Sequence, residues 1–350
     1  MQLHVINSNS KGNAYILSND REALLIECGV RFELIKQALQ FNVAKVAGCI
    51  VSHEHGDHSK GVYDTLKAGI KVYASAGTHK ALATENHYRA IVLKHAVPHS
   101  IGRFKVMPFD VKHDVAEPIG FLIEHEECGL VLFLTDSYYS EYTFPGLNNI
   151  IVEANYDQRI LDQRLANGED PKFLRDRVIV SHMSLATCKG LLNANDLSQV
   201  NNIVLIHLSD RNADADRFKT EISLETGKPV HIATPGFTLH FCLKLPVQFI
   251  PHTLLFFLKF IAASFRWAQG FMSNFLFVFY IQKNFMPLLP VLFKKLKEFW
   301  HVHAFIHLSV FAPKQPLQKQ QQVFNCQLVF PGAFNDGICE VNNLLRAHGP

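Results

Sequence analysis

The sequence predicts an α/β fold for residues 1–245, and two patterns support this class. Short apolar runs that read as buried strands alternate with segments of helical spacing, which is the order an α/β domain requires. Several of the apolar runs end in Asp or His, and α/β folds usually place their sites at the carboxyl ends of strands. We therefore expect a polar site at one edge of the sheet.

The first expected elements lie before residue 75. Apolar side chains recur at helical spacing in residues 32–39, after the Cys-Gly turn, and this spacing predicts a helix. Residues 46–51 are apolar and partly β-branched, as a buried strand should be. A second helix is predicted over 59–68, and residues 70–74 alternate like a strand.

The later elements follow the same alternation. Residues 102–109 form an extended stretch, and the apolar runs 130–136 and 203–207 each predict a strand that ends in a polar residue. Residues 157–177 are rich in charge and predict one helix with a surface connection. Another helical stretch begins near Ser184.

Residues 52–58 read Ser-His-Glu-His-Gly-Asp-His and follow the strand predicted at 46–51. This segment brings together three imidazoles and a carboxylate, from His53, His55, Asp57 and His58. Both groups are ligands that zinc, manganese and iron accept. If His53 and His55 leave the strand end on the same side, they can hold one metal, while Asp57 and His58 face a second. The alternative is a polar loop in which histidines cluster by chance.

Three further ligand types follow predicted strands elsewhere in the chain. His113 comes after the extended stretch 102–109, Asp136 ends the apolar run 130–136, and His207 ends the run 203–207. A single Asp or His at a strand end is more often a turn former or a helix cap. Together with the first cluster, the three residues predict a site for two metal ions.

These motifs resemble the metallo-β-lactamase-fold hydrolases, and in detail the YycJ or WalJ branch of bacterial nuclease-like proteins. That branch opens with a Ser-x-Ser-x-Gly-Asn segment, which residues 8–13 match, and the resemblance covers about residues 1–243. It implies a four-layer αββα sandwich with a dinuclear site at one edge of its two sheets. One departure is visible, because Glu27 stands where the family usually has Asp; that acid orients the ligand loop.

The resemblance also implies a set of metal ligands. The first metal would be held by His53, His55 and His113, the second by Asp57, His58 and His207, and Asp136 would bridge the two. Zinc is the expected metal, with manganese or iron as alternatives. Glu54 and Asp114 are adjacent candidates for orienting the ligand imidazoles.

The segment around His182 resembles the phosphodiesterase side of the superfamily, which includes the tRNA 3′-processing enzymes. This resemblance implies that His182 lies near the scissile phosphate as a general acid and that Glu153 is its partner. The predicted catalytic residues are therefore Asp57, His182 and Glu153. Two alternatives are that His182 caps the helix beginning near Ser184, or that it is a core histidine.

Three functions are compatible with these residues. The favoured one is a dinuclear-metal phosphodiesterase or nuclease that attacks DNA or RNA through a metal-bridging hydroxide. The second is a thioester or other acyl hydrolase of the same fold, which would need an oxyanion donor. The third is a non-catalytic metal-binding regulatory protein, which a complete ligand set argues against.

Composition divides the chain near residue 245. Residues 1–245 hold 25 Lys and Arg against 28 Asp and Glu, which excludes a broad basic face as the main source of nucleic-acid affinity. Residues 246–350 hold 9 basic and 3 acidic residues, 17 of the 28 Phe and both Trp. This apolar tail is predicted to be membrane-associating, disordered, or non-native read-through. Membrane association is expected only through the tail.

A cytoplasmic location is predicted from two features. The first ten residues lack the basic and apolar regions of a signal peptide. The cysteines before residue 245 show no CxxC pair and no disulfide-rich spacing, so reduced thiols are expected.

Overall fold

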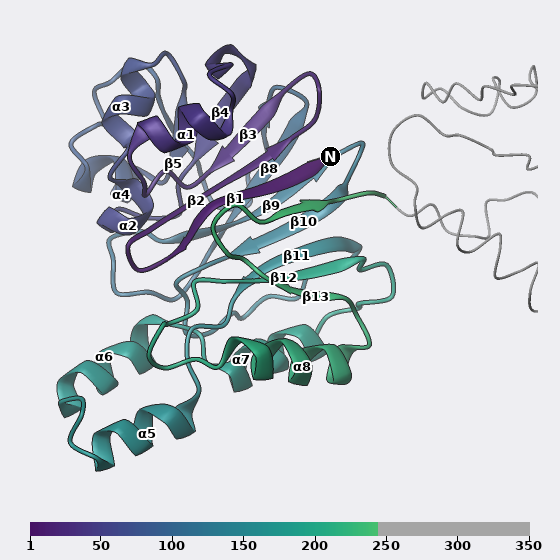
Figure 1. Cartoon of the computed structure of the whole chain (residues 1–350). Helices are drawn as coiled ribbons and strands as arrows, with labels where there is room; N and C mark the ends of the chain where they lie inside the picture. Colours follow the sequence, from purple (N-terminus) through teal and green to yellow (C-terminus); the bar gives the residue numbers. More distant parts are fainter. Residues whose placement is uncertain (244–350) are drawn as a thin grey trace, which may run out of the picture. The chain divides into compact units, whose positions relative to one another are not determined.

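The computed structural model of the chain describes residues 1–243 (Figure 1). Within them, two seven-stranded sheets form the body of the fold. The predictions made for residues 246–350 lie outside the described residues, and the division of the chain at residue 245 stays a prediction. The part of the chain from 1 to 243 contains no helix that is both long and apolar enough to cross a membrane.

The first sheet has the strand order β14-β1-β2-β3-β4-β5-β6, and the second has the order β13-β12-β11-β10-β9-β8-β7. Strands β3 to β6 pair in parallel, as do β10 to β13, and the remaining neighbours pair antiparallel. The strands are β1 (Gln2–Asn9), β2 (Gly12–Ser18), β3 (Ala23–Ile26), β4 (Val46–Ile50), β5 (Val72–Ala74), β6 (Ala90–Val92), β7 (His99–Ile101), β8 (Phe104–Asp110), β9 (Ile119–His125), β10 (Gly129–Leu134), β11 (Leu147–Glu153), β12 (Asn202–Ile206), β13 (Val230–Ile232) and β14 (Thr238–His240).

Helices cover the outer faces of both sheets. In Figure 1, α1, α3 and α4 lie on the outer side of the first sheet, and α7 and α8 lie on the outer side of the second. The helices are α1 (Phe32–Ala38), α2 (Gly56–Ser59), α3 (Val62–Lys67), α4 (Ala76–Ala81), α5 (Gln158–Ala166), α6 (Lys172–Ser181), α7 (Leu185–Asn193) and α8 (Ala215–Thr226), with a 3-10 turn at Val43–Lys45. The expected four-layer αββα sandwich is confirmed.

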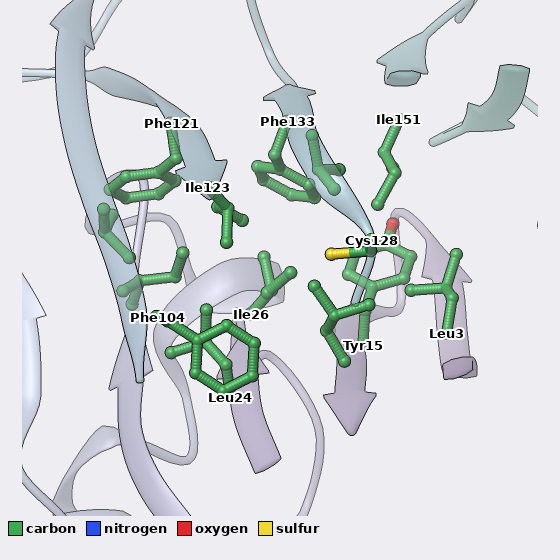
Figure 2. Packing of buried hydrophobic residues seen from close by; sticks show 14 of the residues in the cluster. Leu3, Tyr15, Leu24, Ile26, Phe104, Phe121, Ile123, Cys128, Phe133 and Ile151 are labelled. Atoms are coloured by element: carbon green, nitrogen blue, oxygen red, sulfur yellow. The ribbon is translucent and has the colours of Figure 1, made fainter. Parts of the chain in front are cut away.

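The main core lies between the two sheets (Figure 2). Side chains alternate between the faces of a strand, so every second residue of β2 and β10 points toward the opposite sheet. Tyr15 of β2 meets Phe133 of β10 edge to face, with ring centroids 5.7 Å apart, and Phe121 of β9 packs on the other side of Phe133. All three rings are fully buried, and burying a large apolar side chain contributes roughly 1.5–3 kcal/mol.

Most expected elements lie where the sequence placed them, and two differ. The helix predicted over 59–68 is two short helices, α2 and α3, interrupted at Lys60 and Gly61. The single helix predicted in 157–177 is wrong, because the segment folds as α5 and α6 joined by residues 167–171. Gly168, in the left-handed conformation, ends the first helix, and α6 begins directly after Pro171.

Candidate metal centre

The carboxyl ends of three neighbouring parallel strands meet at one edge of the second sheet. Asp136 follows β10, Glu153 is the last residue of β11, and His207 follows β12. Asp136 and His207 both adopt the left-handed backbone conformation, with φ of 43° and 52°. That conformation is strained for a non-glycine residue, and such strain concentrates at functional sites. The sharp turns direct both side chains into the edge of the sandwich.

The first sheet contributes the remaining polar residues from the loop after β4 and from α2. His53 and His55 lie in the loop, and Asp57 and His58 lie in α2, whose N-cap position is His55. His113, which follows β8 of the second sheet, joins them. The structure thus brings together all seven residues that the sequence proposed as metal ligands.

Three groups of donor atoms lie close enough to hold a metal ion, and two of them contain the proposed ligands. In the first, ligand atoms of His53, His55, His113 and Asp136 all lie within 4.8 Å of one another. In the second, ligand atoms of Asp57, His58 and His207 do so. These are the two groups that the sequence proposed, with Asp136 next to both.

Asp136 contacts both groups. Its Oδ2 lies 3.4 Å from His58 Nε2 and 3.7 Å from the Nε2 atoms of His53 and His113. Its Oδ1 lies 3.1 Å from His207 Nδ1. A carboxylate in this position can reach two cations at once, one in each donor group.

A third cluster joins Glu153 to two histidines. Its Oε1 lies 2.8 Å from His182 Nδ1 and 3.1 Å from His207 Nδ1. The Nε2 atom of His207 lies 3.3 Å from Asp57 Oδ2. When His207 donates its Nδ1 proton to Glu153, the lone pair on Nε2 is free to face Asp57 and His58.

The structure shows where the His182 side chain lies, and its role as a general acid stays a prediction. Ser184, not His182, caps α7, because the Ser184 hydroxyl accepts a hydrogen bond from the backbone N–H of Thr187. The His182 side chain is 21% exposed and lines the cavity of the site, so it is not a core histidine. His182 is therefore neither the cap of α7 nor a core histidine, and these two alternatives are wrong.

Glu27, the departure from the family pattern, lies behind the ligand residues. It is fully buried after β3, its Oε1 accepts a hydrogen bond from the backbone N–H of Ser52, and its Oε2 lies 3.6 Å from His58 Nδ1. The hydrogen bond to Ser52 holds the backbone of the ligand loop in place, and the second carboxylate oxygen lies beside the His58 ring without a hydrogen bond to it. The longer side chain of Glu still reaches this position.

Several polar contacts were not anticipated from the sequence. Fully buried Asn13 places its amide nitrogen 3.1 Å from His58 Nε2, and the Ser8 hydroxyl accepts a hydrogen bond from the His207 backbone N–H. The Ser52 hydroxyl lies 2.8 Å from His53 Nδ1. Ser8 and Asn13 belong to the opening Ser-x-Ser-x-Gly-Asn segment, so the motif pointed to the segment without showing what its side chains contact.

Asp114 and Glu54, the two candidates for orienting the ligand imidazoles, make different contacts. Asp114 Oδ1 lies 3.4 Å from His113 Nδ1, although that nitrogen lies closer, at 2.8 Å, to the carbonyl oxygen of Ser181. Glu54, the other candidate, accepts a hydrogen bond from the backbone N–H of Ala116. The last residue of α6 therefore positions His113.

Two of the imidazoles are held neutral. Burial lowers the pKa of His53 well below its ordinary value, with neighbouring imidazoles acting in the same direction and Asp136 opposing them. Burial also lowers the pKa of His113. A neutral imidazole offers a nitrogen lone pair, which is the form that binds a metal ion.

The other side of the site has an excess of negative charge. Burial disfavours a charge on His207, yet the carboxylates of Asp136, Asp57 and Glu153 together raise its pKa to about 10. Burial also opposes ionisation of Asp136, but the histidines around it, with His207 first, hold its pKa well below the ordinary value. The buried acids thus require positive charge beside them, and either protons or divalent ions can supply it.

The donor set fits a metal ion. His53 Nε2 is buried, points at the first donor group, and has no hydrogen-bond partner among residues 1–243. Leaving a buried polar atom unpaired costs about 1–3 kcal/mol, so an unpaired imidazole nitrogen beside a carboxylate is the expected place for a cation. His and Asp donors suit zinc, manganese and iron.

The ligand atoms open onto a cavity of about 320 Å³ at the edge of the sandwich. Its walls combine the site residues with a few residues from the surrounding loops and from α6. The lining residues are Ser10, His55, Gly56, Asp57, His113, Asp114, Asp136, Arg177, Ser181, His182 and His207. This cavity gives a substrate access to both donor groups and to His182.

Comparison with known families agrees with this geometry. Residues 23–208 match the family described as the β-lactamase superfamily domain. The chain belongs to this superfamily. The matched region runs from β3 to the residue after His207, so it contains every proposed ligand.

Individual relatives support the same assignment. A protein named exodeoxyribonuclease YycJ, from Bacillus anthracis, is 29% identical over 227 residues, which cover 60% of this chain and 83% of the relative. A protein named exodeoxyribonuclease WalJ, from Streptococcus pneumoniae, is 24% identical over 224 residues, covering 59% of this chain and 81% of the relative. The crystal structure of the metallo-β-lactamase-fold protein YhfI from Bacillus subtilis matches with a TM-score of 0.53 at 17% identity, covering 68% of this chain and 98% of that one.

The resemblance to metallo-β-lactamase-fold hydrolases and the YycJ or WalJ branch is confirmed, as is the α/β sandwich. The chain is a metal-dependent hydrolase of this superfamily, and its candidate metal site lies at the edge of the sandwich. The cysteines at 28, 49, 128, 188 and 242 are free thiols.

Proposed function

We propose that the chain is a dinuclear-metal phosphodiesterase that hydrolyses nucleic acid. The observation that carries this proposal is the hydrogen bond between His182 and Glu153 beside the two donor groups. His182 lies in the wall of the cavity beside the donor groups, and its bond to a buried carboxylate supports a role as an acid–base group. The relatives named exodeoxyribonuclease support a nucleic-acid substrate.

In this proposal, each donor group would hold one metal ion. His53, His55 and His113 would hold the first, Asp57, His58 and His207 would hold the second, and Asp136 would be shared between them. Zinc is the proposed metal because imidazole nitrogen dominates the set, and manganese or iron would also fit. When bound, two such ions activate water and neutralise charge on the phosphate undergoing attack.

The chain's own residues supply the proton transfer. Glu153 is fully buried and accepts the Nδ1–H of His182, which fixes the ring and leaves Nε2 toward the cavity. There, Nε2 gives its proton to the leaving oxygen of the diester. A positioned general acid is typically worth about 10²–10⁴-fold in rate. Asp57, beside the cavity, is held ionised because His207 and His58 lower its pKa despite partial burial.

The charge balance also favours a diester. The five imidazoles of the proposed ligand set bind a metal ion in their neutral form, and Asp57 and Asp136 add two negative charges to that set. With two divalent ions the site is net cationic, which suits an anionic substrate. Free thiols and a nucleic-acid substrate both favour the predicted cytoplasmic location.

The test is a cleavage assay on the full-length chain with its bound metal quantified. Labelled single- and double-stranded DNA and RNA are incubated with the wild type, with Asp136→Ala and with His182→Ala. The proposal expects cleavage by the wild type, none by Asp136→Ala, and a metal-replete His182→Ala that is slower by about 10²–10⁴-fold. A metal-replete wild type that cleaves no nucleic acid would overturn it and leave the acyl hydrolase as the better candidate.

A further inference from the structure

Helices α5 and α6 form an arm that projects from the second sheet, while α7 and α8 lie against that sheet (Figure 1). We call residues Gln158–Ser181 the α5–α6 arm. Its two helices are joined by an ion pair in which Arg175 Nη2 lies 2.7 Å from Asp162 Oδ1. The arm is anchored at the site, because the carbonyl oxygen of Ser181 accepts the hydrogen bond from His113 Nδ1.

The outward face of α6 is unusual in composition. Phe173, Leu174 and Val180 are 68%, 41% and 53% exposed, and the Arg177 side chain is 66% exposed. Residues 173, 177 and 180 are spaced by four and three positions, so they share one helix face. An exposed aromatic ring and a cation therefore form a stripe along α6.

This stripe leads into the catalytic cavity. Arg177 lines the cavity, and α6 ends at Ser181, immediately before His182. At 1.5 Å per residue, the stretch from Phe173 to Val180 is about 10 Å long, which matches about three nucleotides at the 3.4 Å spacing of a stacked strand. The stripe is thus continuous with the place where we propose the scissile phosphate to bind.

Arg177 differs from the other arginines of the arm. Arg159, Arg164 and Arg175 each lie within 3.0 Å of a carboxylate oxygen. The nearest carboxylate of Arg177 belongs to Asp114, at 4.0 Å. Among the described residues that line the cavity, Arg177 is the only Lys or Arg. Its guanidinium is therefore available to a phosphate.

We infer that the exposed face of α6 is a binding track for a single nucleic-acid strand, which it guides into the cavity. Phe173 stacks on an unpaired base, and Arg177 binds a backbone phosphate next to the scissile one. The inference rests on the proposed function and adds the form of the substrate, since a stacked base must be unpaired. Sites for single strands generally combine aromatic platforms with cations in this way.

Charge argues for the single strand over a duplex. Residues 1–245 carry 25 Lys and Arg against 28 Asp and Glu, so no general excess of cations attracts the dense phosphates of a duplex. Base stacking, in contrast, supplies affinity without a broad basic surface. One aromatic ring and one arginine next to the cavity suffice to order a short strand.

The test compares a dinucleotide with a single strand of about 12 nucleotides, a length within the usual range of such sites. The metal-loaded full-length chain is assayed as wild type, Phe173→Ala, Phe173→Trp and Arg177→Ala. Phe41→Ala is the matched control, because Phe41 is 72% exposed and lies after α1, in the layer on the first sheet. Binding of a labelled phosphorothioate strand of the same sequence, which resists cleavage, is followed by fluorescence anisotropy with the metal still bound.

We expect Phe173→Ala to lower kcat/KM for the long strand between about 5-fold and 100-fold, mainly through KM, and Phe173→Trp to restore it. The dinucleotide should be affected much less, and Phe41→Ala should match the wild type on both substrates. Arg177→Ala should weaken binding of the long strand and reduce its salt dependence.

Two results would overturn the track. One is a wild type that cleaves the long strand while Phe173→Ala and Arg177→Ala cleave and bind it equally well. The other is an equal loss on both substrates in Phe173→Ala, which would mean that the change disturbs the site itself. A wild type that binds the strand through Phe173 without cleaving it supports the track and refutes the proposed function, and one that neither binds nor cleaves refutes both.

Discussion

Replacing Glu153 by Gln tests how one buried acid organises the site. Glu153 accepts four hydrogen bonds: Oε1 from the Nδ1 atoms of His182 and His207, at 2.8 and 3.1 Å, and Oε2 from the backbone N–H groups of Ser137 and Met183, both at 3.2 Å. All four partners are donors. A Gln side chain keeps one acceptor oxygen and adds an amide that donates, so two of the four donors lose their partner whichever way the amide lies.

These contacts set the expected losses in kcat, metal affinity and stability. A rotated or wrongly protonated His182 loses its role as general acid, which costs about 10²–10⁴-fold in kcat. Loss of the acceptor behind His207 weakens metal binding by about 10–100-fold. The buried donors left without partners lower the free energy of unfolding by about 1–3 kcal/mol. Glu153→Gln should therefore fold, bind metal less tightly and turn over slowly.

The assay measures kcat on a labelled single strand, the metal affinity, and urea unfolding of the same preparations. Glu126→Gln is the control, because Glu126 is 62% exposed and paired with Arg103 away from the site. An unchanged kcat and an unchanged metal affinity in Glu153→Gln would refute the claim that this acid orients both histidines.

Three further outcomes are expected. Phe133→Ala should lower the free energy of unfolding in urea by about 3–5 kcal/mol, since the ring is fully buried between the sheets; a loss below about 1 kcal/mol would contradict the packing. The pKa of Asp157 lies at about 2, because Arg159 and Arg217 outweigh the effect of its burial. Ionised Asp157 should add about 2 kcal/mol to the free energy of unfolding above pH 4, and this stabilisation should be lost as the pH falls from about 4 to 2. Asp157→Asn should show less of this decline in acid unfolding curves, and parallel curves would refute the assignment. Chelation should abolish cleavage and lower Tm, because a ligand at 1,000 times its Kd stabilises the folded state by about 4 kcal/mol; added Zn²⁺ should restore both, and an unchanged Tm would count against a bound metal.

Three residues of the site lie at strand ends, which the sequence pattern could indicate. Asp136, Glu153 and His207 come after apolar runs, and parallel neighbouring strands bring their carboxyl ends to the same edge. No contact between distant residues had to be known. Strand alternation placed Asp136 and His207 at this edge, whereas the full ligand set and the role of Glu153 came from the resemblance to metallo-β-lactamase-fold hydrolases.

Other contacts depend on tertiary packing that periodicity does not contain. Ser8 and His207 are separated by 199 positions and meet only because the two sheets face each other. Similarly, the sharing of Glu153 by His182 and His207 depends on where α6 ends.

The α5–α6 arm was the least predictable element. Its second helix exposes Phe173, Leu174 and Val180, so it lacks the buried apolar face that reveals most helices. The β-branched run Val178–Val180 also lowers its intrinsic helix propensity. The helix is instead held by Arg175 and by its anchorage to His113.

The most direct test of the account is a metal titration of the metal-free full-length chain with cleavage as the readout. Zn²⁺ or Mn²⁺ is added stepwise, and hydrolysis of a labelled single strand is measured beside hydrolysis of a thioester and a lactam. The account predicts that strand cleavage rises to a plateau at about two metal equivalents per chain, as a two-metal site requires. A plateau at one equivalent, cleavage independent of metal, or hydrolysis confined to the thioester or lactam would contradict it.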